Sequence, residues 1–522
     1  MLNVTDKIEI RSEWVSEEER IAHYALADLC VFPSISEPFG IVSLEAMACL
    51  PAGEMIISNP VPKPIESIKE GEYVLGSDGN FHKITKTYCR DFEGELISIT
   101  PYNFNQAVKF TPEHPILLIR PMFCKGRQKC RPTCKNAKCK RLLYKKYAPH
   151  WIQAKDIKVD DFVLIPIPTL TKDLKSVFVH DFLNVIVKDG KCFTISKNQW
   201  NKKFRSCCKP INDEIKITPD FLKLCGYYIA EGDRESGNGI GFSFSLHEEE
   251  YVNEVKNIIK KEFHLNSVCI QKNRARRVIV HSVILSKLFE KWFGKSAKEK
   301  KIPEWMMNLP NEKIVYLIEG MVNGDGYVEI DRGKYKVIRY ATISKTLALQ
   351  LFFLFLRLGI IPEFKARKNK GFKTDKLANM LYEIKVRLNK KKQYGLIREG
   401  YAWLPVRKVE KIKFKGKVFN LEVEKVNSYA CPFIVHNCEK PVVVGARGIS
   451  GLKEQVIPDG EKRCGVHVNG EDPKDIAWGI NVILDNFEEA KKWGINGRKR
   501  VEENFSIEKT AMETIKIYES LL

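Results

Sequence analysis

Two cysteines far apart in the chain mark the ends of a long internal segment. Cys49 is its first residue, and Cys438 directly follows its last. With residues 49–437 left out, the helical stretch that ends at Ala48 runs through a proline into an apolar strand. With them in place, a proline and a glycine stop that helix directly after Ala48. The pattern therefore predicts that these 389 residues are an insert in an otherwise continuous sequence.

The side chains at the two ends of the insert can rearrange peptide bonds. The Cys49 thiol can attack the carbonyl that precedes it, and the Cys438 thiol can take over the resulting thioester. The Asn437 amide can attack its own backbone carbonyl and cleave the chain there, with His436 as the proton donor. Proximity enforced by a fold lowers the barrier to each step. We therefore expect the insert to excise itself and to join Ala48 to Cys438.

These ends, together with internal stretches, resemble the splicing blocks of inteins. Residues 49–53 resemble the first block. Thr111 and His114 resemble the Thr-x-x-His block, in which both residues assist the first acyl shift. Residues 418–423 and 434–438 resemble the two closing blocks. The resemblance implies an all-β Hint domain that brings both ends of the insert together and splices without a cofactor.

The insert carries an excess of positive charge. The whole chain has 86 Lys+Arg against 65 Asp+Glu, a formal net charge of +21. The flanks together carry −8, so the insert carries +29. A surplus confined to one module is typical of nucleic-acid binding. The alternative, a lysine-rich thermophile surface, normally carries matching glutamates.

Cysteine usage and hydropathy predict a cytoplasmic protein. The chain has 15 cysteines and no secretory leader, which favours free thiols over a disulfide framework. No run of eighteen apolar residues is present, so we expect no membrane span. Four cysteines lie in a Lys/Arg-rich stretch, where they form either a structural Zn²⁺ site or a reduced loop without metal. They are Cys124, Cys130, Cys134 and Cys139.

Two related segments, about 94 residues apart, carry small residues at helical spacing. Gly226 and Ala230 share one face of the first, and Gly320 and Gly324 share one face of the second. Small residues at i and i+4 allow two helices to pack backbone to backbone. The pattern predicts a pair of helices in direct contact.

Each of these helices ends in an acid, Glu231 in the first and Asp325 in the second. A glycine follows each acid, and we expect it to form a left-handed cap. Two carboxylates at two helix C-termini repel each other and call for a hard cation such as Mg²⁺. The segments resemble the paired LAGLIDADG motifs of homing endonucleases. The resemblance implies Mg²⁺-dependent double-strand cleavage of the host gene that lacks the insert, with both acids as metal ligands.

The two segments depart from the LAGLIDADG pattern at several positions, which leaves open an endonuclease that binds DNA without cutting it. Further basic residues accompany the two segments. Lys301 begins a Lys-Ile-Pro run that resembles another intein endonuclease block, which implies a position near the scissile phosphate. Phosphate contacts position DNA without reading its sequence, so these charges indicate DNA binding and do not identify base-reading residues. Basic residues follow the two acidic motifs, where the family's DNA-binding sheets lie: Arg274, Arg276, Arg277, Lys365, Arg367, Lys368 and Lys370.

The flanks resemble the nucleotide-sugar-binding half of retaining GT-B glycosyltransferases. Glu37 and Glu45 have an E-x7-E spacing, and a glycine-rich loop that includes Gly448 follows the joint. Carboxylates suit sugar hydroxyls, and a glycine-rich turn suits a diphosphate. The resemblance implies that Glu37 lies by the donor sugar and Glu45 by the ribose. The flanks total only 133 residues, so glycosyl transfer, the alternative main function, needs a second chain to supply the missing parts.

The sequence thus predicts a multi-domain protein. It combines an all-β Hint domain, an α+β LAGLIDADG domain and an α/β Rossmann-like half-domain. In the Hint domain, Asn420 stands where many inteins have Asp. The expected units are 1–48 and 438–522 as glycosyltransferase flanks, 49–168 and 401–437 as the Hint domain, 169–215 as a linker or DNA-recognition insert, and 216–400 as the endonuclease.

Overall fold

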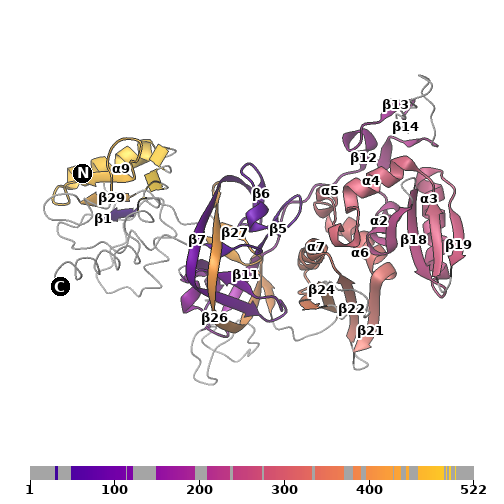
Figure 1. Cartoon of the computed structure of the whole chain (residues 1–522), viewed down its shortest axis with the longest axis horizontal. Helices are drawn as coiled ribbons and strands as arrows, with labels where there is room; N and C mark the ends of the chain where they lie inside the picture. The colour runs from indigo at the N-terminus through magenta and orange to yellow at the C-terminus, as the bar shows by residue number, and fades with distance from the viewer. Residues whose placement is uncertain are drawn as a thin grey trace.

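A computed structural model of the chain shows three assemblies (Figure 1). They are a small parallel sheet from the flanks, a large antiparallel sheet, and a unit of helices and two four-stranded sheets. The structure describes residues 30–32, 49–112, 114–121, 148–193, 209–235, 239–272, 275–331, 335–368, 380–388, 395–426, 428–436, 442–445, 456–486, 489–490, 493–494, 496 and 500.

The large sheet is built around two long antiparallel strands, β7 (Phe81–Pro101) and β26 (Tyr401–Val423). They pair from Val406 opposite Pro101 to Val423 opposite Ile84, and they lie side by side in Figure 1 as indigo and orange ribbons. In β26, exposed lysines alternate with less exposed residues from 411 to 417. This period of two is the one that a strand requires.

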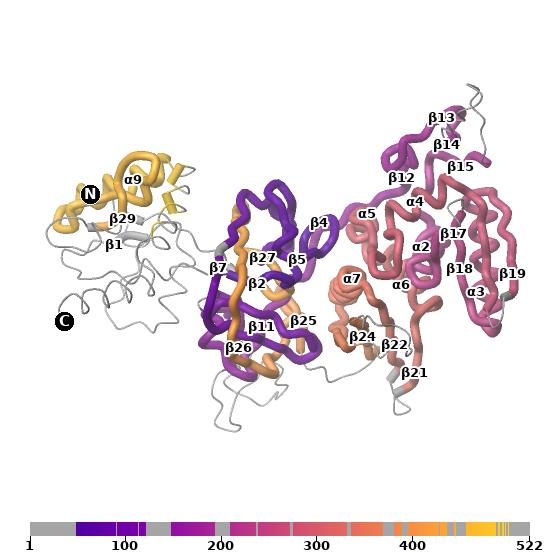
Figure 2. The backbone as a smooth tube through the Cα atoms, in the orientation of Figure 1, coloured from indigo at the N-terminus to yellow at the C-terminus, as the bar shows by residue number. Residues whose placement is uncertain are grey.

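Ten shorter strands complete this twelve-stranded sheet, and they come from both sides of the intervening residues. They are β2 (Leu50–Pro51), β4 (Ser58–Asn59), β6 (Tyr73–Leu75), β8 (Val108–Phe110), β9 (Pro115–Ile119), β10 (His150–Gln153), β11 (Phe162–Pro166), β25 (Leu396–Arg398), β27 (Ser428–Ala430) and β28 (Ile434–His436). The order is β27-β28-β9-β11-β26-β7-β6-β4, with β2 and β25 beside β26, β8 beside β7 and β10 beside β9. Figure 2 shows the indigo and orange segments interleaved. A separate pair, β3 (Met55–Ile56) and β5 (Lys63–Pro64), flanks the sheet.

In the third assembly, helices α2 (Pro219–Glu231) and α6 (Asn311–Asp325) are in direct backbone contact. A Cβ on Gly226 would lie 2.3 Å from the Leu317 carbonyl oxygen, and a Cβ on Gly320 would lie 2.1 Å from that of Lys223. Only glycine permits this approach. The predicted helix pair is confirmed.

The predicted left-handed caps of these helices are wrong. Gly232 has a φ of −85° and Gly326 a φ of −82°, both in the extended region. Each helix instead passes directly into a strand. A glycine is still required, because a Cβ on Gly326 would lie 2.3 Å from the Val322 carbonyl oxygen.

The elements after α2 and α6 repeat the same topology. One sheet has the order β17-β18-β20-β19 and the other β21-β22-β24-β23, so the second half is a copy of the first. The first contains β17 (Gly232–Glu235), β18 (Gly239–Ser245), β19 (Val268–Lys272) and β20 (Ala275–Val280), with α3 (Glu249–Phe263) and α4 (Val283–Phe293). The second contains β21 (Gly326–Asp331), β22 (Tyr335–Thr342), β23 (Glu363–Lys368) and β24 (Met380–Arg387), with α7 (Lys345–Arg357).

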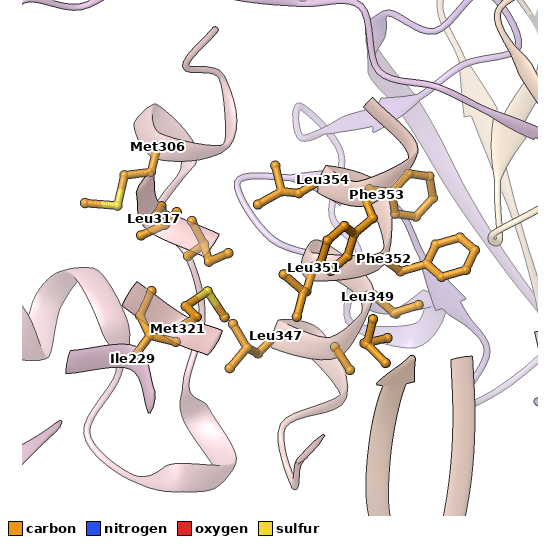
Figure 3. Close-up of a cluster of buried hydrophobic side chains, with 14 of the residues drawn as sticks. Ile229, Met306, Leu317, Met321, Leu347, Leu349, Leu351, Phe352, Phe353 and Leu354 are labelled. Carbon is orange, nitrogen blue, oxygen red and sulfur yellow. The ribbon is translucent and has the colours of Figure 1, made fainter. Parts of the chain in front are cut away.

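A buried apolar cluster joins the helices of this unit (Figure 3). It includes Ile229 of α2, Met321 of α6 and Leu347 of α7. The same cluster extends to the large sheet through Phe104, which is 1% exposed. The Phe104 ring stacks on Phe364 at 4.7 Å between centroids and meets Phe352 edge-on at 5.5 Å. The large sheet and the helical unit therefore share one core.

Short elements connect these two assemblies. The strand β12 (Ser176–Phe178) pairs with β16 (Glu214–Lys216). The strands β13 (Ile186–Lys188), β14 (Lys191–Phe193) and β15 (Ile211–Asn212) form a three-stranded sheet. The short helix α5 (Glu304–Met307) contacts the large sheet, where Asn59 donates a hydrogen bond to Glu304 at 2.7 Å.

The two flanks meet in one parallel sheet. The strand β1 (Cys30–Phe32) pairs with β29 (Val442–Gly445), and β29 pairs with β30 (Gly465–Val468). The helix α9 (Pro473–Asp485) packs on it through Ile483, which is fully buried. Segments on opposite sides of the insert thus complete each other. Among the described residues, no helix has the length and apolar character that crossing a bilayer requires.

Candidate functional sites

The first site surrounds Cys49, which is 1% exposed. The backbone N–H of Cys49 donates to the Thr111 hydroxyl oxygen at 3.0 Å. That hydroxyl donates in turn to the Cys49 carbonyl oxygen at 3.2 Å, which also accepts the Thr111 backbone N–H at 3.0 Å. Thr111 and His114 are themselves fully buried. The peptide nitrogen of Cys49 is therefore held in a fixed, water-excluded position.

The other end of the insert reaches the same place. The strand β28 pairs with β9 through Val435 opposite Ile116, two residues beyond His114. It also pairs with β27, with the His436 backbone opposite Ser428. Cys49 and Val435, the residue before His436, are thus both attached to the short stretch 111–116. The predicted residues Asn437 and Cys438 lie outside the described part of the chain.

Asn420 lies near the start of the insert. Leu50, the residue after Cys49, pairs with Phe419, the residue before Asn420. The Asn420 side-chain oxygen accepts the Leu421 N–H and the Tyr429 hydroxyl, each at 2.9 Å. Because a backbone N–H needs an acceptor, the orientation of the amide is fixed, and its buried Nδ2 has no hydrogen-bond partner among the described residues.

The second site is a cavity of about 510 Å³ at the ends of α2 and α6. Glu231, Asp325 and Lys300 all line it, together with the start of β17 and the end of β22. Burial, and then the charge of Asp325, raise the pKa of Glu231 to about 7. Burial likewise raises the pKa of Asp325. Two oxygen donors whose mutual repulsion needs a counter-charge suit a hard divalent cation.

Lys300, which the sequence interpretation passed over, lines this cavity, as does Lys295. Its ammonium donates to the carbonyl oxygens of Tyr228 at 2.6 Å and Gly232 at 2.7 Å. Burial lowers its pKa to about 8. Lys301, the predicted residue, lines a neighbouring cavity instead. Lys300 and Lys301 both directly precede Ile302 in the sequence. This pair of adjacent lysines is the only sequence signal that could have indicated Lys300 as well as Lys301.

Several predicted residues lie on the strands of the two repeated sheets. Arg276 and Arg277 belong to β20, and Lys365, Arg367 and Lys368 belong to β23. Other predicted residues lie outside the described part of the chain: Glu37, Glu45, Gly448, Arg274, Lys370, Cys124, Cys130, Cys134 and Cys139.

The raised pKa of Glu231 predicts a pH-dependent stability. The folded chain retains a proton on Glu231 up to about pH 7, whereas an unfolded glutamate loses it near 4.5. Stability therefore falls as pH rises through this window. Without divalent metal, the unfolding temperature should fall between pH 5 and 8, and Glu231→Gln should raise it at pH 8 by about 2–4 °C.

Differential scanning calorimetry in EDTA measures this effect. Glu312→Gln is the matched control, because Glu312 is exposed on the first turn of α6. It should leave the pH curve unchanged. An unfolding temperature for Glu231→Gln equal to that of the parent chain at pH 8 would contradict the expectation.

Two family models match parts of the chain. Residues 312–394 match the LAGLIDADG-like domain, and they span α6 to β24. Residues 4–86 match Glycosyl transferases group 1. This second match runs past Cys49 into the first strands of the large sheet.

Curated relatives match about three quarters of the chain. An uncharacterized protein of Methanocaldococcus jannaschii, MJ0043, is 28% identical over 75% of this chain and 50% of its own length. An iron-sulfur cluster assembly SufBD family protein of Mycobacterium tuberculosis is 29% identical over 76% of this chain and 43% of its own. The ATP-dependent DNA helicase Hel308 of Thermococcus kodakarensis is 25% identical over 76% of this chain and 36% of its own length. The chain thus spans half or less of these relatives.

Solved structures resemble parts of the chain. Mesophilic variants of the homing endonuclease I-DmoI cover 33% of this chain and 90% of their own, at 13% identity and a TM-score of 0.25. A bacterial intein-like domain from Clostridium thermocellum covers 23% of this chain and 67% of its own, at 20% identity and a TM-score of 0.16.

Proposed function

We propose that the chain is a self-splicing precursor that excises residues 49–437 and joins Ala48 to Cys438. The convergence of both ends of the insert on residues 111–116 carries this proposal. Cys49 is bonded to Thr111, and β28 ends beside the strand that follows His114. Cys49 and Val435, which are hundreds of residues apart in sequence, are thereby both tied to this stretch, and such proximity favours intramolecular acyl transfer.

The proposed reaction conserves every atom. The Cys49 thiol attacks the Ala48 carbonyl and expels the Cys49 amine, which leaves a thioester. The Cys438 thiol then displaces the Cys49 thiolate. The Asn437 amide nitrogen attacks its own backbone carbonyl and expels the Cys438 amine, which finally attacks the thioester to form the peptide bond. Thr111 orients the Cys49 amide throughout the first step, and His114 and His436 serve as proton donors.

Two independent observations support an inserted module. The flanks complete one parallel sheet across the insert, so they belong together without it. The three curated relatives described above carry unrelated names, yet they match 75–76% of this chain, and 389 of its 522 residues are the proposed insert. A module inserted in different hosts produces this pattern.

Intact mass spectrometry of the expressed chain under reducing conditions tests the splicing proposal. We expect a 389-residue insert and a 133-residue ligated product. A chain with both Asn437→Ala and Cys438→Ala is the control, and it should stay unspliced. A single 60.1 kDa species at every temperature and thiol concentration would overturn the proposal.

We also propose that the insert is a double-strand DNA endonuclease. The pairing of Glu231 and Asp325 with Lys300 in one cavity carries this second proposal. The two carboxylates would hold Mg²⁺, which activates water and stabilises phosphate charge when bound. Lys300 places a cation where charge develops on the phosphate. Cleavage of duplex DNA that encodes the joined flanks tests the activity, and double-strand breaks in Mg²⁺ but not in EDTA are the expected result.

The flanks support a narrower proposal. Their parallel sheet with α9 and the Glycosyl transferases group 1 match favour part of a nucleotide-sugar-binding domain. Glycosyl transfer would also need an acceptor-binding part, and we propose that a second chain can supply it. Copurification of such a chain with the ligated product tests this point.

A further inference from the structure

The outer faces of the two repeated sheets differ at equivalent positions. Gly232 pairs with Phe242 in the first sheet, and Gly326 pairs with Tyr340 in the second. This register makes Gly241 the counterpart of Arg339. By the same register, Asp233 corresponds to Tyr327, Glu235 to Glu329 and Arg277 to Glu383.

In the first sheet, the guanidinium of Arg277 is saturated. Its Nε donates to Glu235 at 2.9 Å, and Nη1 donates to Asp233 and to Ser243, each at 2.9 Å. Its Nη2 donates to Asp233 and to Glu235, each at 2.5 Å. All five N–H donors of the side chain are therefore used. The group lies above Gly241, where a Cβ would be 2.7 Å from Nη2.

In the second sheet, Arg339 lies at the Gly241 position, and among the described residues its guanidinium hydrogen-bonds only to Glu329, with Glu383 as a more distant ion-pair partner. Its Nε and Nη2 both donate to one oxygen of Glu329, at 2.9 and 2.6 Å. The nearest approach of Nη1 to Glu383 is 3.6 Å. The counterpart of Asp233 is Tyr327, which cannot replace a carboxylate. The edge formed by Nη1 and Nη2 is thus left without a bidentate partner among the described residues.

This edge faces away from the protein core. Tyr340 and Ile384, the neighbours of Arg339 on the opposite face, are 2% and 1% exposed. Tyr327, directly across the ladder from Arg339, is 61% exposed and lies two residues after Asp325. Arg339 is therefore a partly exposed, oriented fork close to the proposed cleavage site.

We propose that Arg339 reads one guanine in the half-site over the β21–β24 sheet. Its Nη1 and Nη2 would donate to O6 and N7 of the base, the bidentate contact that distinguishes guanine in the major groove. Glu329 fixes the plane of the guanidinium, so little side-chain freedom is lost on binding. Arg277 has no donor left and reads no base. The inference rests on the proposed endonuclease function.

Binding of the full chain to duplexes tests the assignment. The parent duplex encodes the joined flanks, and each base pair is substituted in turn, with affinities measured by competition in Ca²⁺. For the wild-type chain, replacing one G·C pair should weaken binding by about 10- to 100-fold. Arg339→Ala should abolish discrimination at that position alone. Arg339→Lys keeps the positive charge but lacks the bidentate guanidinium, and it should also abolish discrimination at that position. If the alanine variant does not fold, the lysine variant is compared with the wild-type chain instead.

Arg277→Ala is the matched control. It removes an arginine whose guanidinium lies above Gly241, the position that Arg339 has in the other sheet, and it should change the affinity for all duplexes by one common factor. The assignment is overturned if both Arg339 variants weaken binding uniformly, or if Arg277→Ala alone relaxes a single position. A wild-type chain that binds the parent duplex no better than scrambled DNA would instead overturn the endonuclease proposal, and the assignment with it.

Discussion

Lys300→Met is expected to slow DNA cleavage by about 10²–10³-fold, the usual cost of removing one preorganised charge-stabilising donor. Lys301→Met should leave the rate nearly unchanged. The difference follows from their places in the structure. The Lys300 ammonium lies in the cavity with Glu231 and Asp325, whereas Lys301 lines the neighbouring one.

Single-turnover cleavage of the joined-flank duplex in Mg²⁺ measures this contrast, and binding in Ca²⁺ separates catalysis from affinity. Lys300→Met should retain binding, because the carbonyl oxygens that it contacts belong to the protein and not to DNA. Lys300→Arg keeps a cation and should recover part of the rate. Equal losses for the Lys300 and Lys301 substitutions would contradict the assignment.

The helix pair could be predicted because its cause is local in sequence. Small residues four apart, followed by an acid, specify both the contact face and the end that carries the carboxylate. The choice between Lys300 and Lys301 could not be predicted in this way. Lys300 is selected by the carbonyl oxygens of Tyr228 and Gly232, about 70 residues away in the chain. Only tertiary contact distinguishes two adjacent lysines.

The glycines after the acids illustrate the same limit. Sequence correctly indicates that Gly232 and Gly326 end the two helices, yet a glycine at a helix end is compatible with either a left-handed cap or a tight passage into a strand. The choice depends on the strand that follows and on the atoms around the missing Cβ. Likewise, sequence alone does not show that the folded sheet uses all the donors of Arg277 and leaves part of the Arg339 guanidinium available.

The twelve-stranded sheet could be predicted from the sequence only in part. Alternation of lysines with apolar residues predicts that β26 is a strand, but it does not say which strand pairs with it. The pairing with β7 depends on a register that spans more than 300 residues of sequence. The resemblance at Cys49, Thr111 and His114 supplied the expectation that the ends meet. Among the described residues, the folded sheet ties Cys49 to Thr111 and pairs Val435 with Ile116.

Thr111→Val is expected to slow the first acyl shift at Cys49 by about 10–100-fold. Valine has nearly the same shape as threonine but lacks the hydroxyl, so the Cys49 N–H loses its acceptor in a buried site. An unsatisfied buried donor costs about 1–3 kcal/mol. The Cys49 carbonyl oxygen keeps the Thr111 backbone contact, which any residue at 111 can supply except proline. The effect should therefore fall on the orientation of the amide rather than on the fold.

Thiol-induced cleavage at Cys49 measures this step in a chain where Asn437→Ala and Cys438→Ala block the later ones. Thr111→Ser is the matched control, because serine keeps the hydroxyl and should stay close to the parent rate. Similar unfolding temperatures of the valine and serine variants would exclude loss of the sheet as the cause. Cleavage of Thr111→Val at the parent rate would mean that the hydroxyl only fills space beside Cys49, and the first step would then depend on His114 for its acceleration.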